Sequence, residues 1–226
     1  MKIAALYDVH GMPHALEAVL AEVEREGCDA IVFGGDVLCG PLPRETLELV
    51  RSVDAQFIRG NCEDESSEFQ RERIGEETER WLASWPLTLE LDGVLYCHSL
   101  PTSNVRIVTE RTPDAVFDAA LDGIETRLVV GGHSHHQFRR GRYVNAGSVG
   151  MPYEGDVAAF WAIISDDVEF RRTPFPVERA AEAIAASGWP RAESFVQENL
   201  LIAPVREEAI EWLEQRRNAD QGRTRR

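Results

Sequence analysis

The amino-terminal quarter of the chain alternates apolar runs of strand length with segments whose apolar residues recur at helical spacing. The apolar runs are residues 3–6, 30–33 and 56–58, and the helical segments between them are residues 14–26 and 43–53. Strands that alternate with helices pair in parallel, because each helix returns the chain to the same end of the sheet. The pattern therefore predicts a helix-covered parallel sheet that binds ligands at the carboxyl edge of its strands.

Further strands follow in the middle of the chain. Residues 87–91 and 94–97 flank Asp92-Gly93, a dipeptide typical of a two-residue hairpin turn. From residue 137 onward the chain reads as consecutive strands with hairpin turns, which predicts a second sheet. The expected fold is α/β, a sandwich of two sheets with helices on the outside.

One domain accounts for these elements. We expect it to span residues 1–217, with a core of about 1–175 and carboxyl-terminal helices over about 176–217. The polar, arginine-rich residues 218–226 are expected to be a disordered tail. The highly charged residues 64–83 predict a solvated helix, and the alternative is that this segment overhangs the site.

Charge and cysteine spacing narrow the class of protein. The 226 residues include 39 acidic and 24 basic side chains, so the formal net charge is −15. This balance disfavours a dedicated nucleic-acid-binding protein, which needs a basic face. No apolar segment suits a membrane span or a signal peptide. The four cysteines lack C-x-x-C spacing, so we expect reduced thiols in a cytoplasmic protein, with its oligomeric state left open.

Five apolar runs each end in side chains that can hold a metal ion. These residues are Asp8, His10, Asp36, Asn61, His98, His133 and His135. They include four of the six histidines of the chain, which chance placement explains poorly. Carboxylate, imidazole and amide donors suit a divalent cation, and they exclude calcium more firmly than they separate the other candidates.

Seven ligands are too many for one tetrahedral ion and suit two ions about 3.5–4 Å apart that share a carboxylate. Asp36 stands alone on its strand end and is the natural bridge. Two divalent cations, the carboxylates of Asp8 and Asp36 and a bridging hydroxide leave about one positive charge, which attracts an anionic phosphate. The composition thus allows a small anionic phosphoester as substrate despite the negative net charge.

These residues resemble the five-block signature of the calcineurin-like metallophosphoesterases. The blocks are Asp8-x-His10, Gly35-Asp36, Gly60-Asn61, the strand-end His98 and Gly132-His133-x-His135. The glycine-rich stretch 145–152 resembles a loop of the small bacterial and archaeal single-domain branch of that superfamily, and the resemblance covers about residues 1–175. It implies the metallo-dependent phosphatase fold, a four-layer α/β/β/α sandwich of two mixed sheets flanked by helices.

The resemblance also implies how the ligands divide. Asp8, His10 and His135 would hold one ion, Asn61, His98 and His133 the other, and Asp36 would bridge them. The metals of the family are manganese, iron, zinc, nickel or magnesium, and manganese is favoured here. Asp36, Asn61 and His98 are carried over as catalytic residues on the same basis.

The sequence departs from the family at several positions. Cys62 stands where many members have a histidine that acts on the leaving group or the phosphate, and a neutral thiol is a poor proton donor. His136 could replace that donor, but the favoured expectation is that it is exposed. Arg59 and Arg106 are the candidates for contacting phosphate, with a surface ion pair as the alternative for each.

The leading hypothesis is a dinuclear metal-dependent phosphoesterase in which a metal-bound hydroxide attacks the phosphorus. A phosphodiester or nucleotide is favoured over a monoester, because Cys62 gives a poor leaving group little help. The alternatives are a non-catalytic metal-binding scaffold with the same fold and a hydrolase of a dinucleoside tetraphosphate.

Overall fold

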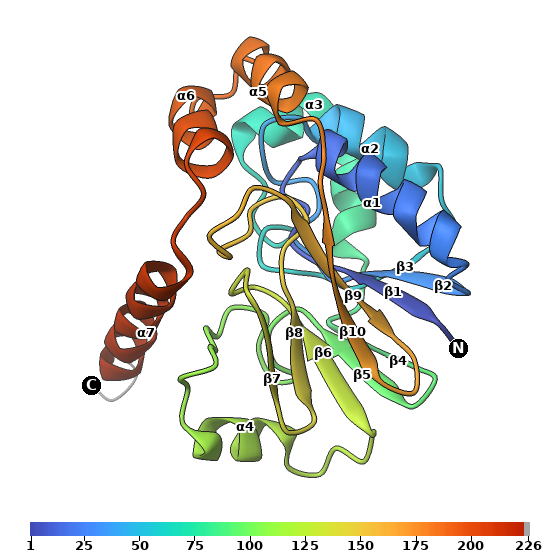
Figure 1. The fold of residues 1–226 in the computed structure, drawn as a ribbon, viewed down its shortest axis with the longest axis vertical. Helices are drawn as coiled ribbons and strands as arrows, with labels where there is room; N and C mark the ends of the chain where they lie inside the picture. Colours follow the sequence, from blue (N-terminus) through green and yellow to red (C-terminus); the bar gives the residue numbers. More distant parts are fainter. Residues whose placement is uncertain (224–226) are drawn as a thin grey trace.

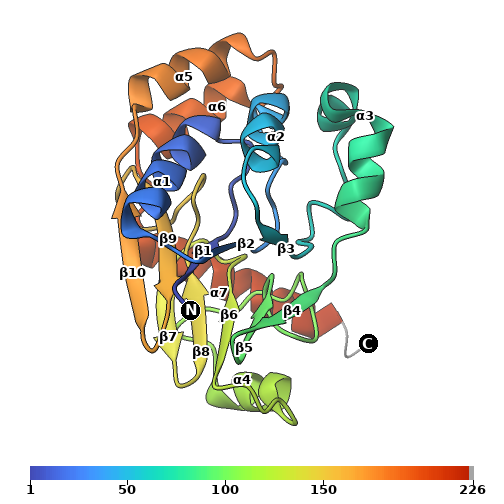
Figure 2. The same cartoon turned by 90° about the vertical axis from the view of Figure 1, so that its right-hand side faces the viewer.

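The computed structural model describes residues 1–223, and side chains as far as Arg217. Two five-stranded sheets face each other and helices lie on the outer faces (Figures 1 and 2). The first sheet contains β1 (Ile3–Leu6), β2 (Ala30–Phe33), β3 (Gln56–Phe57), β9 (Ala159–Ile164) and β10 (Val168–Thr173). The second contains β4 (Thr88–Leu91), β5 (Val94–Cys97), β6 (Leu128–Gly131), β7 (Gln137–Arg140) and β8 (Tyr143–Ala146). The expected α/β sandwich of two mixed sheets is confirmed.

Both sheets have a parallel centre and antiparallel edges. The first runs in the order β10-β9-β1-β2-β3, in which β1, β2 and β3 are parallel and β9 and β10 are antiparallel. The second runs in the order β4-β5-β6-β8-β7, with β5, β6 and β8 parallel. The carboxyl ends of six parallel strands therefore lie on one side of the sandwich, where the chain can gather ligands.

The predicted second sheet is present, but the strands after residue 137 divide between the two sheets. β7 and β8 extend the second sheet, which begins with β4 to β6. β9 instead pairs with β1, so that Ile164 lies opposite Ile3. All six residues of β9 are buried, as expected of an interior strand, but burial alone does not identify the neighbouring strand.

Strand β1 is buried on both faces, which explains its uninterrupted apolar sequence. Ile3 and Ala5 point into the core between the sheets, whereas Ala4 and Leu6 pack under the helices. The helices over the first sheet are α1 (Pro13–Glu26), α2 (Pro43–Arg51), α3 (Glu68–Ala83), α5 (Val177–Ala186), α6 (Ala192–Phe195) and the π-helix η1 (Val196–Leu201). Helix α4 (Asp114–Leu121) covers the second sheet, with Phe117 packed against Tyr143.

The charged segment forms helix α3 from residue 68 onward, and Gly75 interrupts it with a φ of 74°. Its Trp81 packs edge-on against Phe57 of β3, and Thr78 accepts a hydrogen bond from Arg51 of α2. The helix is therefore fixed by its apolar side to α2 and to the edge of the first sheet.

The last helix, α7 (Arg206–Arg223), continues six residues beyond the predicted end of the domain. The expectation of a disordered tail from residue 218 stays a prediction, and residues 224–226 lie outside the described residues. Arg206 pairs with Glu110 and Glu154, and Thr109 donates a hydrogen bond of 2.6 Å to Glu214. These contacts tie α7 to the loop that precedes α4. Among residues 1–223, no helix has the length and apolar character needed to cross a membrane.

A charged cluster fastens α1 to β10 and gives a pH-dependent prediction. Thr173 and Arg171 donate hydrogen bonds of 2.6 and 3.1 Å to the Glu22 carboxylate. Burial raises the pKa of Glu22, but these hydrogen bonds outweigh it and hold the pKa below its usual value. Because its pKa is lowered in the folded protein, the ionised Glu22 carboxylate contributes its full stabilisation above the unfolded-state pKa of about 4.3. This stabilisation is lost as the pH falls through the folded-state pKa.

We expect Glu22→Gln to lower the free energy of unfolding at pH 7 by about 1 kcal/mol or less, because water screens this partly buried cluster. Urea unfolding should show the difference shrink as the pH falls below about 4.3. Glu24→Gln, at an exposed position of the same helix, is the control. A difference that stays constant across this pH range would contradict the assignment.

Candidate metal centre

The seven predicted ligands meet at the carboxyl ends of the parallel strands. Five of them have a positive φ, a conformation that non-glycine residues seldom adopt. They are Asp8 (52°), His10 (49°), Asp36 (53°), His133 (67°) and His135 (58°). The only other described non-glycine residue with a positive φ is Asp92, in the hairpin turn. Strained backbone is thus concentrated where the predicted ligands lie, as is typical of functional sites.

Two glycines let the ligand loops approach one another closely. A Cβ on Gly60 would lie 2.2 Å from Oδ1 of Asp36, and a Cβ on Gly132 would lie 2.6 Å from Oδ2 of Asp8. Real Cβ atoms do not approach other atoms so closely, so a side chain at either position would displace a predicted ligand. This explains why glycine precedes both Asn61 and His133.

The first group of ligands consists of Asp8, His10 and His135, whose donor atoms lie within 4.8 Å of one another. Oδ1 of Asp8 is 3.4 Å from Nε2 of His135 and 3.8 Å from Nε2 of His10. The two imidazoles approach to 3.1 Å through their Nε2 atoms. Asp8 Oδ1 is buried and has no hydrogen-bond partner, so this oxygen is free to bind a cation.

The second group consists of Asp36, His98 and His133. Nε2 of His98 lies 3.5 Å from Asp36 Oδ1 and 3.1 Å from the side-chain oxygen of Asn61. The other oxygen of Asp36 lies 4.0 Å from Nε2 of His10, in the first group. Asp36 therefore reaches both groups, as its predicted bridging role requires.

Backbone carbonyls orient all four histidines. Nδ1 of His10, His98 and His135 donates to the carbonyls of Cys39, Gly34 and Met151, at 3.2, 2.8 and 2.7 Å. In His133 it is Nε2 that contacts a carbonyl, that of Val105 at 3.2 Å. Each ring thus has one nitrogen fixed by the backbone and the other turned toward the carboxylates, the arrangement typical of metal-binding histidines. The residues therefore fit a pair of divalent cations.

The electrostatics of the cluster agree with a site for cations. Burial lowers the pKa of His98, but the Asp36 carboxylate outweighs it and raises this pKa to about 10. Burial likewise raises the pKa of Asp36, but His98 holds it well below its usual value. Burial, followed by His98, lowers the pKa of His133 to about 4. The two buried carboxylates, Asp8 and Asp36, thus favour positive charge close to them, and a bound cation would supply that charge.

Glu63 is a positioning residue that sequence reasoning missed. Its buried carboxylate accepts hydrogen bonds of 2.8 Å from the backbone amides of Asp36, Val37 and Gly60. These bonds clamp the loop that carries Asp36 to the loop that carries Asn61. Burial and the neighbouring Asp36 raise the pKa of Glu63 to about 7. The sequence offered one indication of this role: Glu63 lies two residues after the predicted ligand Asn61, directly after Cys62.

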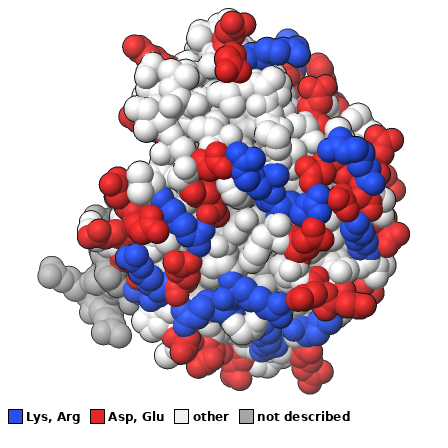
Figure 3. All heavy atoms as spheres, viewed as in Figure 1, with Lys and Arg blue, Asp and Glu red and all other residues white. Residues whose placement is uncertain are grey.

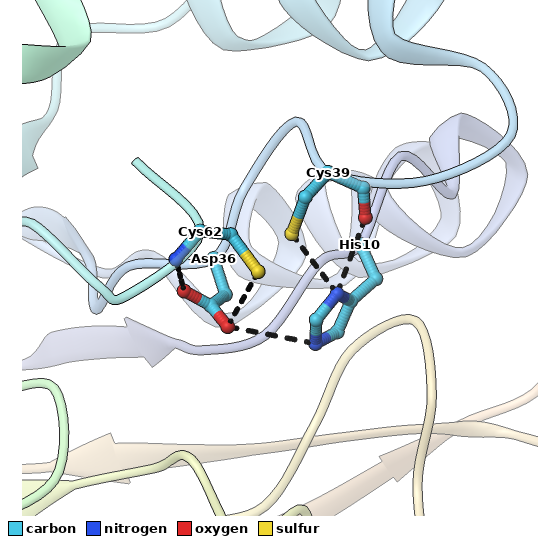
Figure 4. Close-up of side chains that lie close together, drawn as sticks. All are labelled: His10, Asp36, Cys39 and Cys62. Atoms are coloured by element: carbon cyan, nitrogen blue, oxygen red, sulfur yellow. Dashed lines mark hydrogen bonds and ion pairs between the residues drawn. The ribbon is translucent and has the colours of Figure 1, made fainter. Parts of the chain in front are cut away.

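Cys62 supports Asp36. Its backbone amide donates to Asp36 Oδ1 at 2.8 Å, and its thiol donates to Oδ2 at 3.1 Å (Figure 4). A hydrogen bond with Cys39 lowers the pKa of the Cys62 thiol, but burial and the Asp36 carboxylate outweigh it and raise the pKa to about 12. The thiol proton is therefore engaged with Asp36.

The other candidates have structural contacts of their own. Arg59 pairs with Asp64 at 3.0 Å and donates to the carbonyl of Ala83 at 2.7 Å, which matches the ion-pair alternative. Arg106 is exposed, and its carbonyl accepts a hydrogen bond from the Ser99 hydroxyl.

The expectation that His136 is exposed was wrong. Its ring is buried and stacks on Phe138 at a centroid distance of 5.0 Å, while its Nδ1 donates to the carbonyl of Ser134. Residues 136 and 138 share one face of the chain as it enters β7, and that face packs under α4.

Comparison with known proteins identifies the family. Residues 1–166 match the Calcineurin-like phosphoesterase superfamily domain. The chain belongs to the calcineurin-like phosphoesterase superfamily. Members of this superfamily depend on two divalent metal ions, which agrees with the two ligand groups joined by Asp36.

Relatives of this phosphoesterase match most of its length. A protein of Methanocaldococcus jannaschii, "Uncharacterized protein MJ0912", is 27% identical, and the match covers 83% of this chain and 93% of that protein. A metallophosphoesterase from Sphaerobacter thermophilus is 26% identical with a TM-score of 0.72, over 90% of this chain and 100% of that one. The hypothetical protein PH1004 from Pyrococcus horikoshii OT3 is 19% identical with a TM-score of 0.71, over 86% of this chain and 97% of that one. The last similarity is one of fold.

Proposed function

We propose that this calcineurin-like phosphoesterase is a phosphodiesterase that uses two divalent cations, with manganese favoured, on a small anionic phosphoester or nucleotide. The observation that carries the proposal is the position of Asp36, whose two oxygens face His98 on one side and His10 on the other. The similarity to the Sphaerobacter thermophilus protein, a metallophosphoesterase, supports the reaction class.

Asp8, His10 and His135 would hold one cation and Asn61, His98 and His133 the other, with Asp36 shared. When bound, such cations polarise the phosphoryl oxygens and lower the pKa of water to near neutrality. The protein's own contribution is to hold these ligands rigidly, through the four backbone carbonyls that orient the histidines and through Glu63. Preorganised ligands of this kind need no rearrangement during the reaction.

Cys62 supports the preference for diesters. Its thiol is hydrogen-bonded to Asp36, and the raised pKa makes it a weak acid at neutral pH. A weak acid gives a departing alkoxide little help, so substrates with a stable leaving group are favoured. The neighbouring His136 is buried against Phe138 and is poorly placed to replace it.

Charge and cysteine chemistry agree with a small substrate and a reducing compartment. Acidic and basic side chains are interspersed on the face shown in Figure 3. Broad nucleic-acid binding needs a basic face instead. All four cysteines are free, which supports placing the protein in the cytoplasm.

The test is an activity screen of the manganese-loaded protein on matched substrates. We expect bis-p-nitrophenyl phosphate to be hydrolysed at least about tenfold faster than p-nitrophenyl phosphate, a difference of about 1.4 kcal/mol in activation free energy. Both substrates release p-nitrophenolate, so their rate ratio measures the preference for a diester directly. Nucleotides and a dinucleoside tetraphosphate belong in the same screen. Faster monoester hydrolysis would contradict the diester preference. Two bound metals without turnover on any substrate would favour the scaffold alternative.

A further inference from the structure

Two cysteines lie beside the metal centre without being among its expected ligands. Cys39 follows Asp36 in the loop after β2, and Cys62 follows Asn61 in the loop after β3. Both are half-buried free thiols. Figure 4 shows their sulfur atoms turned toward the same space, next to His10 and Asp36.

The contacts of these thiols form one cluster of donor atoms. Cys39 Sγ lies 3.1 Å from Nδ1 of His10, and Cys62 Sγ lies 3.1 Å from Oδ2 of Asp36. The donor atoms of His10, Asp36, Cys39 and Cys62 all lie within 4.8 Å of one another.

Two sulfurs, one imidazole nitrogen and one carboxylate oxygen are the donor types and the number of donors that a tetrahedral zinc site uses. Ligands of one tetrahedral zinc ion lie at about 2.0–2.3 Å from the metal, and hence about 3.3–3.8 Å from one another. The 4.8 Å limit on the present donors therefore leaves only small side-chain rotations to close the shell. Thiolates select soft cations, whereas magnesium and manganese prefer oxygen and imidazole donors.

We propose that Cys39, Cys62, His10 and Asp36 form a binding site for a thiophilic divalent cation such as Zn²⁺ or Cd²⁺. Binding transfers the two thiol protons to solvent, and the resulting thiolates coordinate the ion. The site differs from the dinuclear centre in its two sulfur ligands. It competes with that centre for Asp36 and His10.

This competition has a consequence for metal selection. A thiophilic ion in this site removes the bridging carboxylate from the dinuclear centre, while manganese has little affinity for the sulfur pair. Zn²⁺ and Cd²⁺ thus displace manganese from the protein. Because the site is defined by sulfur coordination, it can be tested whether or not the protein hydrolyses a phosphodiester.

The decisive experiment is a titration of the full-length, metal-free protein with Cd²⁺. A phosphine keeps the thiols reduced, and binding is followed by the ultraviolet charge-transfer absorption of sulfur-bound cadmium. Wild type should develop this band to saturation at tight affinity. Cys39→Ser should weaken the affinity about 100-fold or more, since four ligands share the binding free energy of such a site. Cys28→Ser, which removes a free thiol in the turn after α1, is the matched control and should bind as wild type does.

A second measurement separates the site from a general effect on folding. Zn²⁺ binds nitrogen and oxygen ligands more tightly than manganese does, so it should release manganese from all three proteins at high concentration. Release should require a higher Zn²⁺ concentration in Cys39→Ser than in wild type and Cys28→Ser. Circular dichroism and thermal unfolding should show that all three proteins fold alike. Equal Cd²⁺ affinity in Cys39→Ser and wild type, or loss of the band in Cys28→Ser, would overturn the proposal.

Discussion

Asp36→Ala is expected to lower the rate of phosphoester hydrolysis by about 1000-fold or more. Asp36 lies between the two ligand groups, with Oδ1 3.5 Å from His98 Nε2 and Oδ2 4.0 Å from His10 Nε2. Its removal leaves each group with one ligand fewer and takes a negative charge from between two dications. Metal ions contribute several kcal/mol to transition-state stabilisation, and each 1.4 kcal/mol is a factor of ten in rate.

Metal content should change with activity in this variant. Elemental analysis of wild type should give two metal ions per chain, and of Asp36→Ala one or fewer. Asp54→Ala changes an exposed carboxylate at the other end of β3 and should keep both metals and full activity. Retained activity in Asp36→Ala, with circular dichroism showing a native fold, would refute the assignment of Asp36 as the bridge.

Glu63→Gln is expected to weaken metal binding about 10- to 100-fold, the usual effect of losing a residue that orients a metal ligand. The Glu63 carboxylate accepts three amide hydrogen bonds, from Asp36, Val37 and Gly60. Glutamine has the same shape, but its amide nitrogen donates and leaves at least one buried backbone N–H without an acceptor. Glu63→Ala leaves all three without one, so its free energy of unfolding should fall by about 3 kcal/mol or more.

A manganese titration distinguishes a Glu63 that only positions the metal ligands from a Glu63 that takes part in the reaction itself. If Glu63 only holds the Asp36 loop in place, saturating Mn²⁺ should restore much of the kcat of Glu63→Gln. Glu65→Gln, an exposed neighbour, should match wild type in metal affinity and stability. Wild-type metal affinity in Glu63→Gln would show that the three amide hydrogen bonds are dispensable for the site.

Most of the metal centre could be predicted before the structure was known. Asp8, His10, Asp36, Asn61, His98, His133 and His135 were identified because each follows an apolar run of strand length, and strand ends are where parallel sheets place ligands. The donor types were visible as residue types. Their division into two groups came from the family resemblance, and the distances place Asp8, His10 and His135 together as that resemblance implied.

The supporting residues were harder to predict because their roles depend on contacts rather than on residue type. Glu63 reads as one acid among 39, and only the three amides around it show that it clamps two loops. His136 reads as a polar residue beside a ligand, yet its ring packs on Phe138. Cys39 and Cys62 are 23 residues apart and show no spacing typical of a metal site.

The sequence by itself determined the strands, the helices and the chemical nature of the site, because apolar periodicity and side-chain chemistry are local properties. Only the tertiary structure decided that β9 lies beside β1, that α7 binds the loop before α4, and that two thiols stand against Asp36 and His10. These are choices of partner between segments distant in the chain. Several buried strands have similar apolar sequences, so the sequence alone does not say which of them pair. The packing of the whole domain selects the pairs.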